Sequence, residues 1–439
     1  MATTLSQSES FQGVPVDKAG YNKYAVRALI GAALSTFWSG ALIFGYPGIM
    51  KPIWKTNIPA TDGELGWIMT FVILSLGIFT FFAGKWHMKL GTRKSYIVGT
   101  IILVVCMLLV LLSASLHNVW ILYLFAFLNG TASCFVYAPS LATVQQWYPH
   151  KRGLVTGVVN LIFGLSAAIM SPLFQVMYEN LGYAGMNILI IVLIVVTNLI
   201  AAMLAEVPAR TKLTDAQKAA GAQILEEVKN SATGAAPAPD VELKDALRTK
   251  SFWFIWLTWC FMGAAGISMV TLSVGYGNEL AAQGFAVSAV ALLTAFNLTN
   301  GFSRIIAGAL SDKIGRNLLG SISFVLAAIG YFGLPFVANN FILLCIFCAF
   351  VGFAFGTLFA ITAPLGTDLF GLKNFGLIFG CIFTAYGFVG GLVGPLLSSF
   401  VLGQTGSYTV VFTYLGVFCL LAAVFMMLAK PKKKVLVES

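Results

Sequence analysis

The sequence predicts an all-α membrane protein with twelve transmembrane helices in two pseudo-symmetric six-helix bundles. Of its 439 residues, 59% are hydrophobic and only 10% are charged, whereas a soluble domain carries about 25% charged residues. Twelve apolar segments are long enough to cross a bilayer, which takes roughly 20 residues of helix. Because backbone polar groups in lipid must be satisfied internally, segments of this length favour helices over the short alternating strands of a barrel.

The apolar segments form two groups of six, separated by a polar stretch. They predict a bundle over 27–205 and a second over 251–429, with a cytoplasmic linker over 206–250 between them. A cytoplasmic tail over 1–26, without a signal-peptide pattern, precedes an uncleaved first span, and a basic cytoplasmic tail follows over 430–439. In the linker, Thr214 and Asp215 predict a short helix to about Asn230. The spans in order are 27–50, 64–86, 95–115, 119–143, 153–178, 184–205, 251–276, 288–311, 318–338, 341–367, 374–400 and 408–429.

The net charge of +10 is distributed as a membrane protein distributes it, not as a nucleic-acid-binding protein does. All Lys and Arg residues except Lys51, Lys55 and Arg304 fall in segments that share one side of the membrane. An excess of Lys and Arg marks the cytoplasmic side. We therefore expect a multi-pass protein of the plasma (inner) membrane, with both termini in the cytoplasm and the lipid bilayer as a partner.

The two halves repeat one another. "GKWHMKLGTRK" begins at Gly84 and "GALSDKIGRN" begins at Gly308, and their Gly, Lys and Gly residues match at a constant offset. Spans five and eleven both run from a glycine to a proline, over 153–172 and 376–395. A repeat of this kind suggests duplication, and parallel halves with a substrate site between them near the midplane are a transporter architecture.

The two short basic turns are predicted to control conformational change. Asp312 in the second turn can accept hydrogen bonds from a neighbouring span or pair with an arginine, whereas Met88 occupies the same place in the first turn. Glycines in spans five and eleven allow helices to approach closely and slide. The residues expected to act in gating are Asp312, Lys313, Gly315, Arg316, Gly84, Gly91 and Arg93.

Arg304 is the most informative residue of the sequence. It precedes Asp312 by eight residues, which places it about 12 Å from the end of its helix and so near the bilayer centre. An arginine stays protonated there, and no Asp or Glu lies in the middle of any predicted span. Asn297 and Asn300 share its helix face. A guanidinium in this setting is suited to a carboxylate that enters and leaves.

These motifs resemble the major facilitator superfamily, and within it the branch of oxalate/formate antiporters and monocarboxylate transporters, including bacterial-type L-lactate carriers. "GALSDKIGR" resembles the superfamily loop motif, and "GKWHMKLGTRK" resembles it without the acidic residue. The resemblance to the branch rests on "WYPHKRGLVTGVVNLIFGLS" (147–166), "LRTKSFWFIW" (247–256) and "NGFSR", which contains Arg304. It implies secondary active transport by alternating access.

Departures from the branch suggest the substrate. Oxalate antiporters hold a dianion with two cations, and the resemblance places their second cation, a lysine, at Ile382 here. Leu42, Ile43 and Phe379 also stand where oxalate carriers have more polar residues. One arginine among aromatic rings implies a short monocarboxylate such as lactate or pyruvate. The expected substrate-binding residues are Arg304, Asn300, Tyr137, Phe163, Phe355, Phe359, Phe383, Tyr386 and Asn297.

Proton-coupled symport of a monocarboxylate is the expected function. Animal monocarboxylate carriers have an aspartate where Asn300 stands here and a lysine that aligns with Gly48, so the substrate itself can carry the proton. Alternatives are anion exchange of the oxalate:formate kind, export of amphipathic drugs and a carboxylate receptor. No enzyme, cofactor or metal site is expected, and the transporter is expected to be a monomer. His87, His117 and His150 are expected at the surface.

Overall fold

The computed structural model describes residues 14–60, 62–230 and 240–430. Most of the predicted N-terminal tail, the "ATGAAPAP" stretch of the linker and nearly all of the basic C-terminal tail therefore lie outside the described residues. The described chain folds into helices joined by short turns, and its backbone hydrogen bonds are satisfied within each helix as a lipid environment requires.

The first half of the structure, defined as α1 to α6, is a bundle of long helices with one π-helical segment, η2. α1 and α5 both pack against α6, and α3 packs against α5. The bounds are α1 (Lys18–Gly40), η2 (Ala41–Gly45), α2 (Tyr46–Asn57), α3 (Asp62–Leu90), α4 (Thr92–Ser115), α5 (Val119–Trp147) and α6 (Arg152–Leu204).

The second half, defined as α9 to α15, repeats this plan after a linker. The linker contains η3 (Pro208–Arg210), α7 (Asp215–Asn230) and α8 (Leu243–Ala246), so the predicted helix to Asn230 is confirmed. The bounds of the second half are α9 (Lys250–Ala282), α10 (Ala289–Ile314), α11 (Arg316–Gly333), η4 (Leu334–Phe336), α12 (Phe341–Phe370), α13 (Phe375–Thr384), η5 (Ala385–Gly390), α14 (Gly391–Thr405) and α15 (Tyr408–Leu428).

Polar N-caps set the start of several helices. Asn118, Thr249, Ser288 and Asn340 each accept a hydrogen bond from a backbone N–H in the first turn of the following helix. Such a cap satisfies one of the donors that a helix leaves unpaired at its start.

The matched glycines of the two repeat turns have a conformational reason. Gly91 separates α3 from α4 with φ of +80°, and Gly315 separates α10 from α11 with φ of +94°. Both values lie in the region that other residues rarely adopt. The duplication has therefore kept the same sharp turn in both halves.

Eleven of the described helical spans are long and apolar enough to cross a membrane. α10 is not among these eleven, although it has 26 residues and packs extensively against α12. Its polar residues, including Asn297, Asn300 and Arg304, lower its hydropathy. The predicted all-α membrane fold is confirmed, and α10, which is not counted among these eleven spans, carries Arg304.

Three features of the helices depart from the simple list of predicted spans. Predicted spans five and six form one element, α6, which bends at Gly182, where φ is +67°. The first and eleventh predicted spans are each interrupted by a π-helical segment, η2 and η5. Such segments shift the hydrogen-bond register locally and are frequent at functional sites.

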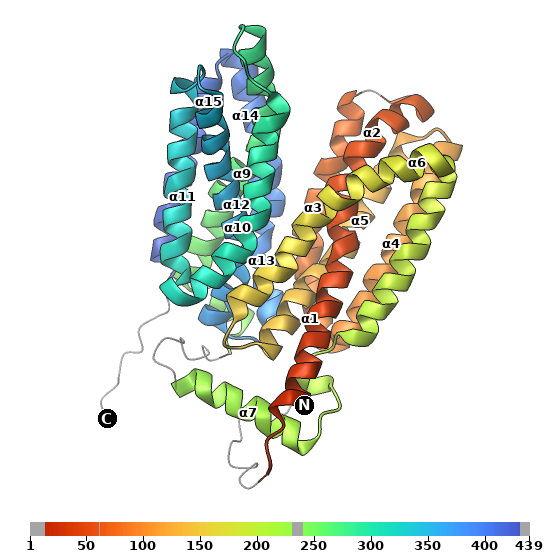
Figure 1. Cartoon of the computed structure of the whole chain (residues 1–439), viewed down its shortest axis with the longest axis vertical. Helices are drawn as coiled ribbons and strands as arrows, with labels where there is room; N and C mark the ends of the chain where they lie inside the picture. The colour runs from red at the N-terminus through yellow and green to blue at the C-terminus, as the bar shows by residue number, and fades with distance from the viewer. Residues whose placement is uncertain (1–13, 61, 231–239, 431–439) are drawn as a thin grey trace.

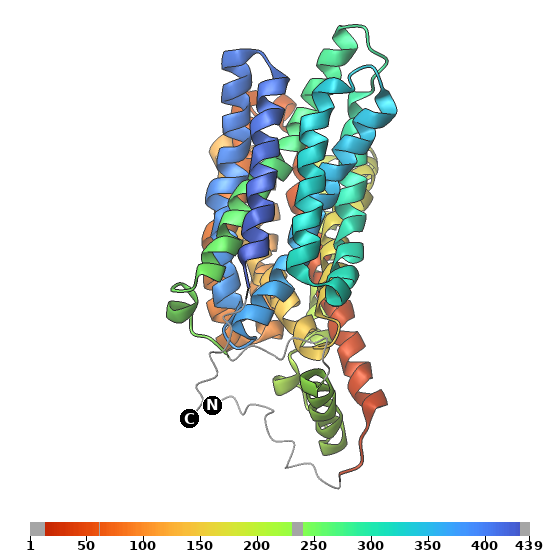
Figure 2. The same cartoon turned by 90° about the vertical axis from the view of Figure 1, so that its left-hand side faces the viewer.

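The two halves stand side by side and diverge away from the end that carries α7 (Figure 1). We call the end at α7 the linker end and the opposite end the far end. A view turned by 90° shows α7 beneath the bundle at the linker end (Figure 2). Among the described residues, the hydrogen bonds between halves lie between the central Arg304 and the linker end.

Glycine pairs bring the halves together. α6 packs against α10, and α3 packs against α13 and η5. A Cβ built on Gly84 would collide with the backbone of Gly376, and one built on Gly308 would collide with Gly153. These two contacts are related by the repeat, so close approach of small residues forms both sides of the interface.

Candidate functional site

Arg304 lies in the interior, between the two halves. Its side chain is only 3% exposed. Nη1 donates to the carbonyl oxygen of Asn160 at 3.2 Å, and Nη2 donates to Oδ1 of Asn300 at 3.3 Å. The guanidinium carbon also lies 4.8 Å from the centre of the Phe359 ring. These partners are neutral, so they stabilise the guanidinium without cancelling its charge.

The charge of Arg304 has no acidic partner within the part of the chain that the structure describes. Its Nε is buried without a hydrogen-bond partner, and none of the ion pairs formed by described residues includes it. Asp312, on the same helix, instead pairs with Arg316. A buried unpaired cation is costly, which makes this position suited to an anion.

Asn160 on α6 connects the site across the halves, and sequence reasoning missed it. Its side-chain Oδ1 accepts a hydrogen bond from the Tyr137 hydroxyl at 2.6 Å, and Nδ2 donates to the Phe359 carbonyl at 3.4 Å. Its backbone carbonyl is the acceptor for Arg304. A single amide in the apolar run "VVNLIFG" was the only signal for it in the sequence.

Aromatic rings from both halves surround this polar centre. Tyr137 lies 5.0 Å from Phe163 and 6.3 Å from Phe383 between ring centres. Phe355 meets Phe359 at 5.3 Å, and Phe359 meets Tyr386 at 5.7 Å. The structure therefore brings all six predicted aromatic residues into one cluster around Arg304.

Trp259 on α9 completes the cluster and was also missed. Its ring lies 4.9 Å from Phe359, 5.0 Å from Phe383 and 5.5 Å from Tyr386. Its Nε1 donates to Thr362 at 3.0 Å, which fixes the ring orientation. In a chain with nine Trp and 36 Phe residues, nothing in the sequence separated this one from ordinary packing.

The aromatic lining is tightly packed in this conformation. The six predicted aromatic residues are each only 3–5% exposed, so their rings are packed against their neighbours. A Cβ built on Gly164 would lie 3.4 Å from the Arg304 guanidinium carbon, which shows how closely α6 approaches the arginine.

Asn297 does not join the cluster. It is exposed and is not among the hydrogen-bond partners of Arg304. It lies seven residues, or about 10 Å along the helix, from Arg304. The guanidinium reaches Asn300, one turn away, but not a residue two turns away.

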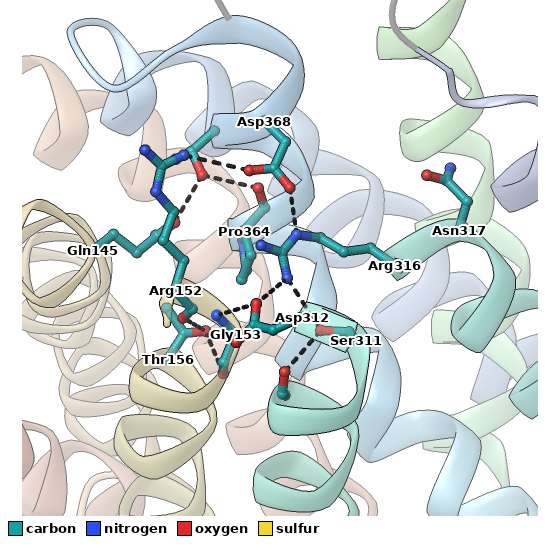
Figure 3. A network of polar contacts seen from close by, with 12 residues as sticks. Gln145, Arg152, Gly153, Thr156, Ser311, Asp312, Arg316, Asn317, Pro364 and Asp368 are labelled. Atoms are coloured by element: carbon teal, nitrogen blue, oxygen red, sulfur yellow. Dashed lines mark hydrogen bonds and ion pairs between the residues drawn. The ribbon is translucent and has the colours of Figure 1, made fainter. Parts of the chain in front are cut away.

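A polar network closes the linker end (Figure 3). Asp312, at the end of α10, accepts hydrogen bonds from the backbone N–H groups of Gly153 and Leu154, both at 3.0 Å. These groups belong to the first turn of α6, where backbone donors are unpaired and the helix dipole favours an anion. The carboxylate of one half thus caps a helix of the other.

Two arginines extend this network, and both have acidic partners. Arg316 contacts Asp312 at 2.8 Å and Asp368 at 2.5 Å. Arg152, from the first half, contacts Asp368 at 3.3 Å. The side chains are 4–22% exposed, so screening by water is limited. The network connects α6 with α10, α11 and α12.

The other predicted gating residues are placed differently. Lys313 and Gly315 are exposed. Arg93 donates to the carbonyl of Ala202 at 2.9 Å and so stays within the first half. Gly84 contacts Gly376 of the second half, and Gly91 forms the turn before α4.

One histidine expectation was wrong. His87 is only 7% exposed, and its Nε2 lies 3.2 Å from the Thr92 hydroxyl. It lies in the last turn of α3, where the following sharp turn folds α4 back over it. His117 and His150 are exposed as expected.

Comparisons with known proteins agree with this architecture. The model of the Major Facilitator Superfamily matches residues 28–292 and 257–438. The oxalate:formate antiporter of Oxalobacter formigenes is 27% identical over 321 residues, which cover 71% of each chain. Monocarboxylate transporter 13 of Rattus norvegicus is 24% identical over 160 residues, covering 36% of this chain and 37% of that protein.

The solved structure of the E. coli fucose:proton symporter shares the fold. It superposes with a TM-score of 0.70 at 13% identity, covering 93% of this chain and 99% of that chain. These findings confirm the predicted fold, and they make the protein a transporter rather than an enzyme. The chain is a multi-pass membrane protein that belongs to the Major Facilitator Superfamily.

Proposed function

We propose that this protein transports a small monocarboxylate, such as L-lactate or pyruvate, by proton-coupled symport. The observation that carries the proposal is the buried Arg304, which has neutral partners and an unpaired Nε. A carboxylate can accept two hydrogen bonds from a guanidinium. One cation matches one negative charge, and the surrounding rings suit an apolar substrate end.

The residues that would bind the substrate are those of the central cluster. Arg304 holds the carboxylate, and Asn300 orients the guanidinium. The Tyr137 hydroxyl, held by Asn160, and the Tyr386 hydroxyl offer further hydrogen bonds. The rings of Phe163, Phe355, Phe359 and Phe383 enclose the apolar end. Asn297 would meet the substrate only on its way to the centre.

In alternating access, the linker end and the far end of the molecule would open in turn. We propose that 27–205 and 251–429 move as two bodies about the Gly84 and Gly308 contacts. The Asp312 network would hold the linker end shut and break when that end opens. With the positive-inside rule, the linker end and both termini lie in the cytoplasm of a monomer in the plasma membrane.

Anion exchange is the second candidate, because one relative is an oxalate:formate antiporter. The buried Ile382 stands where the resemblance implies a second cation, which favours a monoanion over oxalate. The relatives thus support the substrate class more than they support the coupling.

Uptake of labelled L-lactate into proteoliposomes tests coupling. Protein-free vesicles and Arg304→Gln vesicles are needed as controls, because protonated carboxylic acids cross lipid unaided. An acidic outside should drive accumulation into vesicles that contain no substrate. Uptake confined to preloaded vesicles would establish exchange instead. Competition by pyruvate, acetate, formate and oxalate ranks the substrates, and strongest competition by oxalate would contradict the monocarboxylate assignment.

A further inference from the structure

A second candidate binding site lies at the linker end of the first half, away from the central cluster. A cavity of about 300 Å³ opens there between the ends of α1, α4, α5 and α6 and the start of the linker. Its lining is rich in positive charge: four cationic side chains and one carboxylate. The charged lining residues are Arg27, Arg93, Arg210, Lys212 and Glu206.

The cations of this pocket have no acidic partners among the described residues. None of them takes part in the ion pairs of the described chain. Arg93 uses only its Nε, on the Ala202 carbonyl. Arg27 contacts the Tyr24 ring at 5.6 Å. Both guanidinium groups therefore keep their terminal nitrogens available for an anion.

The one carboxylate of the pocket already accepts hydrogen bonds from the protein backbone. Oε1 of Glu206 accepts hydrogen bonds from the backbone of Thr92 at 3.1 Å and Val207 at 3.0 Å. The Glu206 carbonyl accepts one from Trp147 at 2.8 Å. Glu206 thus shapes the wall and leaves a net positive lining.

Arg210 contributes a fixed positive charge to the lining of the pocket. Its Nη1 donates to the Leu90 carbonyl and its Nη2 to the Lys89 carbonyl, both at 2.9 Å, so it caps the end of α3. Its charge is held in place by carbonyl groups and is not neutralised. A Cβ on Gly91 would lie 2.8 Å from its Nη1, so the sharp glycine turn also makes room for this arginine.

Exposed apolar side chains lie on the helices that line the pocket. Met203 is 62% exposed, and Val26 and Ile30 on α1 are each 48% exposed. Apolar side chains therefore flank the cationic pocket where the helices leave the hydrocarbon region. Basic pockets at this depth attract anionic headgroups, and each Lys or Arg strengthens the binding of the headgroup.

We propose that this pocket binds the phosphate group of an anionic phospholipid. Arg27, Arg93 and Lys212 contact the phosphate, Arg210 supplies fixed positive charge, and the acyl chains lie along Val26, Ile30 and Met203. Because Lys212 and Glu206 belong to the linker, the bound lipid joins the linker to the first half.

Native mass spectrometry of the purified full chain tests this site. Phosphatidylglycerol, phosphatidylcholine and inorganic phosphate are added separately, and bound lipid and the apparent unfolding temperature are measured. The test variant is Arg27→Gln with Arg93→Gln. The matched control is Arg248→Gln with Lys250→Gln, which removes two exposed charges from the linker end of the other half. Lys212→Gln, an exposed change, serves if the double variant fails to fold.

We expect the pocket variants to lose phosphatidylglycerol binding specifically. The double variant should bind it about tenfold or more weakly, Lys212→Gln a few-fold more weakly, and the control as tightly as the natural chain. Phosphatidylcholine should leave the unfolding temperature unchanged. If inorganic phosphate alone stabilised the protein, the proposal of a lipid ligand would be overturned, and the ligand would be a soluble phosphate. Equal phosphatidylglycerol binding by the natural chain and by Lys212→Gln and any folded double variant would overturn the site.

Discussion

α3 and α10 occupy equivalent places in the two repeats but carry different chemistry. Each helix contacts the other half through a glycine: Gly84 packs on Gly376, and Gly308 packs on Gly153. At the repeat offset of Gly84 and Gly308, Arg304 corresponds to Thr80 and Asp312 to Met88. The buried Thr80 hydroxyl donates to its own helix, to the Leu76 carbonyl at 2.6 Å.

The difference separates what duplication supplies from what one helix adds. Glycine contacts and sharp turns are shared, so they set the frame in which two halves can move. At the two positions compared, only α10 is charged: it has one arginine without an acidic partner among the described residues in the centre, and one carboxylate that caps α6 at the linker end. Binding and closure would thus depend on the same helix.

Removing the central charge should have the largest effect. Arg304→Gln makes α10 as neutral as α3 at this depth while keeping hydrogen-bond donors. Losing a buried charge pair costs about 2–5 kcal/mol, so L-lactate uptake should fall about 30-fold or more. Protein abundance in the membrane should stay normal. Arg304→Lys, which keeps charge without the planar fork, should retain part of the activity, and normal uptake by Arg304→Gln would remove the basis of the proposed function.

Breaking the closure contact should have the next largest effect. Asp312→Asn removes the charge that Arg316 and the start of α6 share. The linker-closed state should lose about 2 kcal/mol, a shift of about 30-fold in the equilibrium between states.

Spin labels at two exposed far-end positions, Asn180 and Gln283, would report the shift from Asp312→Asn. Closure of the far end should shorten the distance between them. Lys313→Gln removes an exposed charge from the same turn and is the matched control. An unchanged distance distribution in Asp312→Asn would show that the carboxylate does not control the state.

The helices and the central arginine were predictable because hydropathy and charge are written directly in the sequence. The long apolar runs required helices, and an arginine deep in one of them required an explanation. The glycine turn at Gly315 followed from its match with Gly91. These features depend on residues that are close in sequence or repeated at a fixed offset.

Other parts of the site depend on contacts that the sequence does not contain. Asn160 matters because α6 crosses α10, which brings its carbonyl to Arg304. The π-helical segment η5, which carries the predicted Tyr386, was not predicted, because a change of hydrogen-bond register leaves no hydropathy signal. His87 was expected at the surface because it ends a span, but the turn at Gly91 folds α4 over it. Asn297 shares a face with Arg304 but lies too far along the helix.

Replacing the paired glycines by alanine should have a smaller effect than Asp312→Asn, and the effect should differ between the two contacts. Gly84→Ala and Gly308→Ala each place a methyl group against backbone atoms, at a cost of about 1–3 kcal/mol. Gly308→Ala should lower the apparent unfolding temperature more, because it also displaces Asp312 from α6. Gly403→Ala, with no atom within 4 Å of the added Cβ, should change little. Equal losses at Gly84 and Gly308 would mean that the carboxylate adds nothing to the glycine contact.

Supplying the missing carboxylate should have the smallest effect. Met88→Asp gives α3 the acid that α10 has, and by the repeat its partner would be the start of α13. The gain should be about 0.5 kcal/mol in the linker-closed state, because the Leu377 N–H already donates to the Asn374 carbonyl at 3.1 Å. A second variant with Met88→Asp added to Asp312→Asn measures whether the new acid replaces the old one. Full recovery of the far-end distance distribution would show that the two repeat-related contacts are interchangeable, whereas the geometry predicts only slight recovery, since α13 has no counterpart of the Arg152–Asp368–Arg316 network beside it among the described residues.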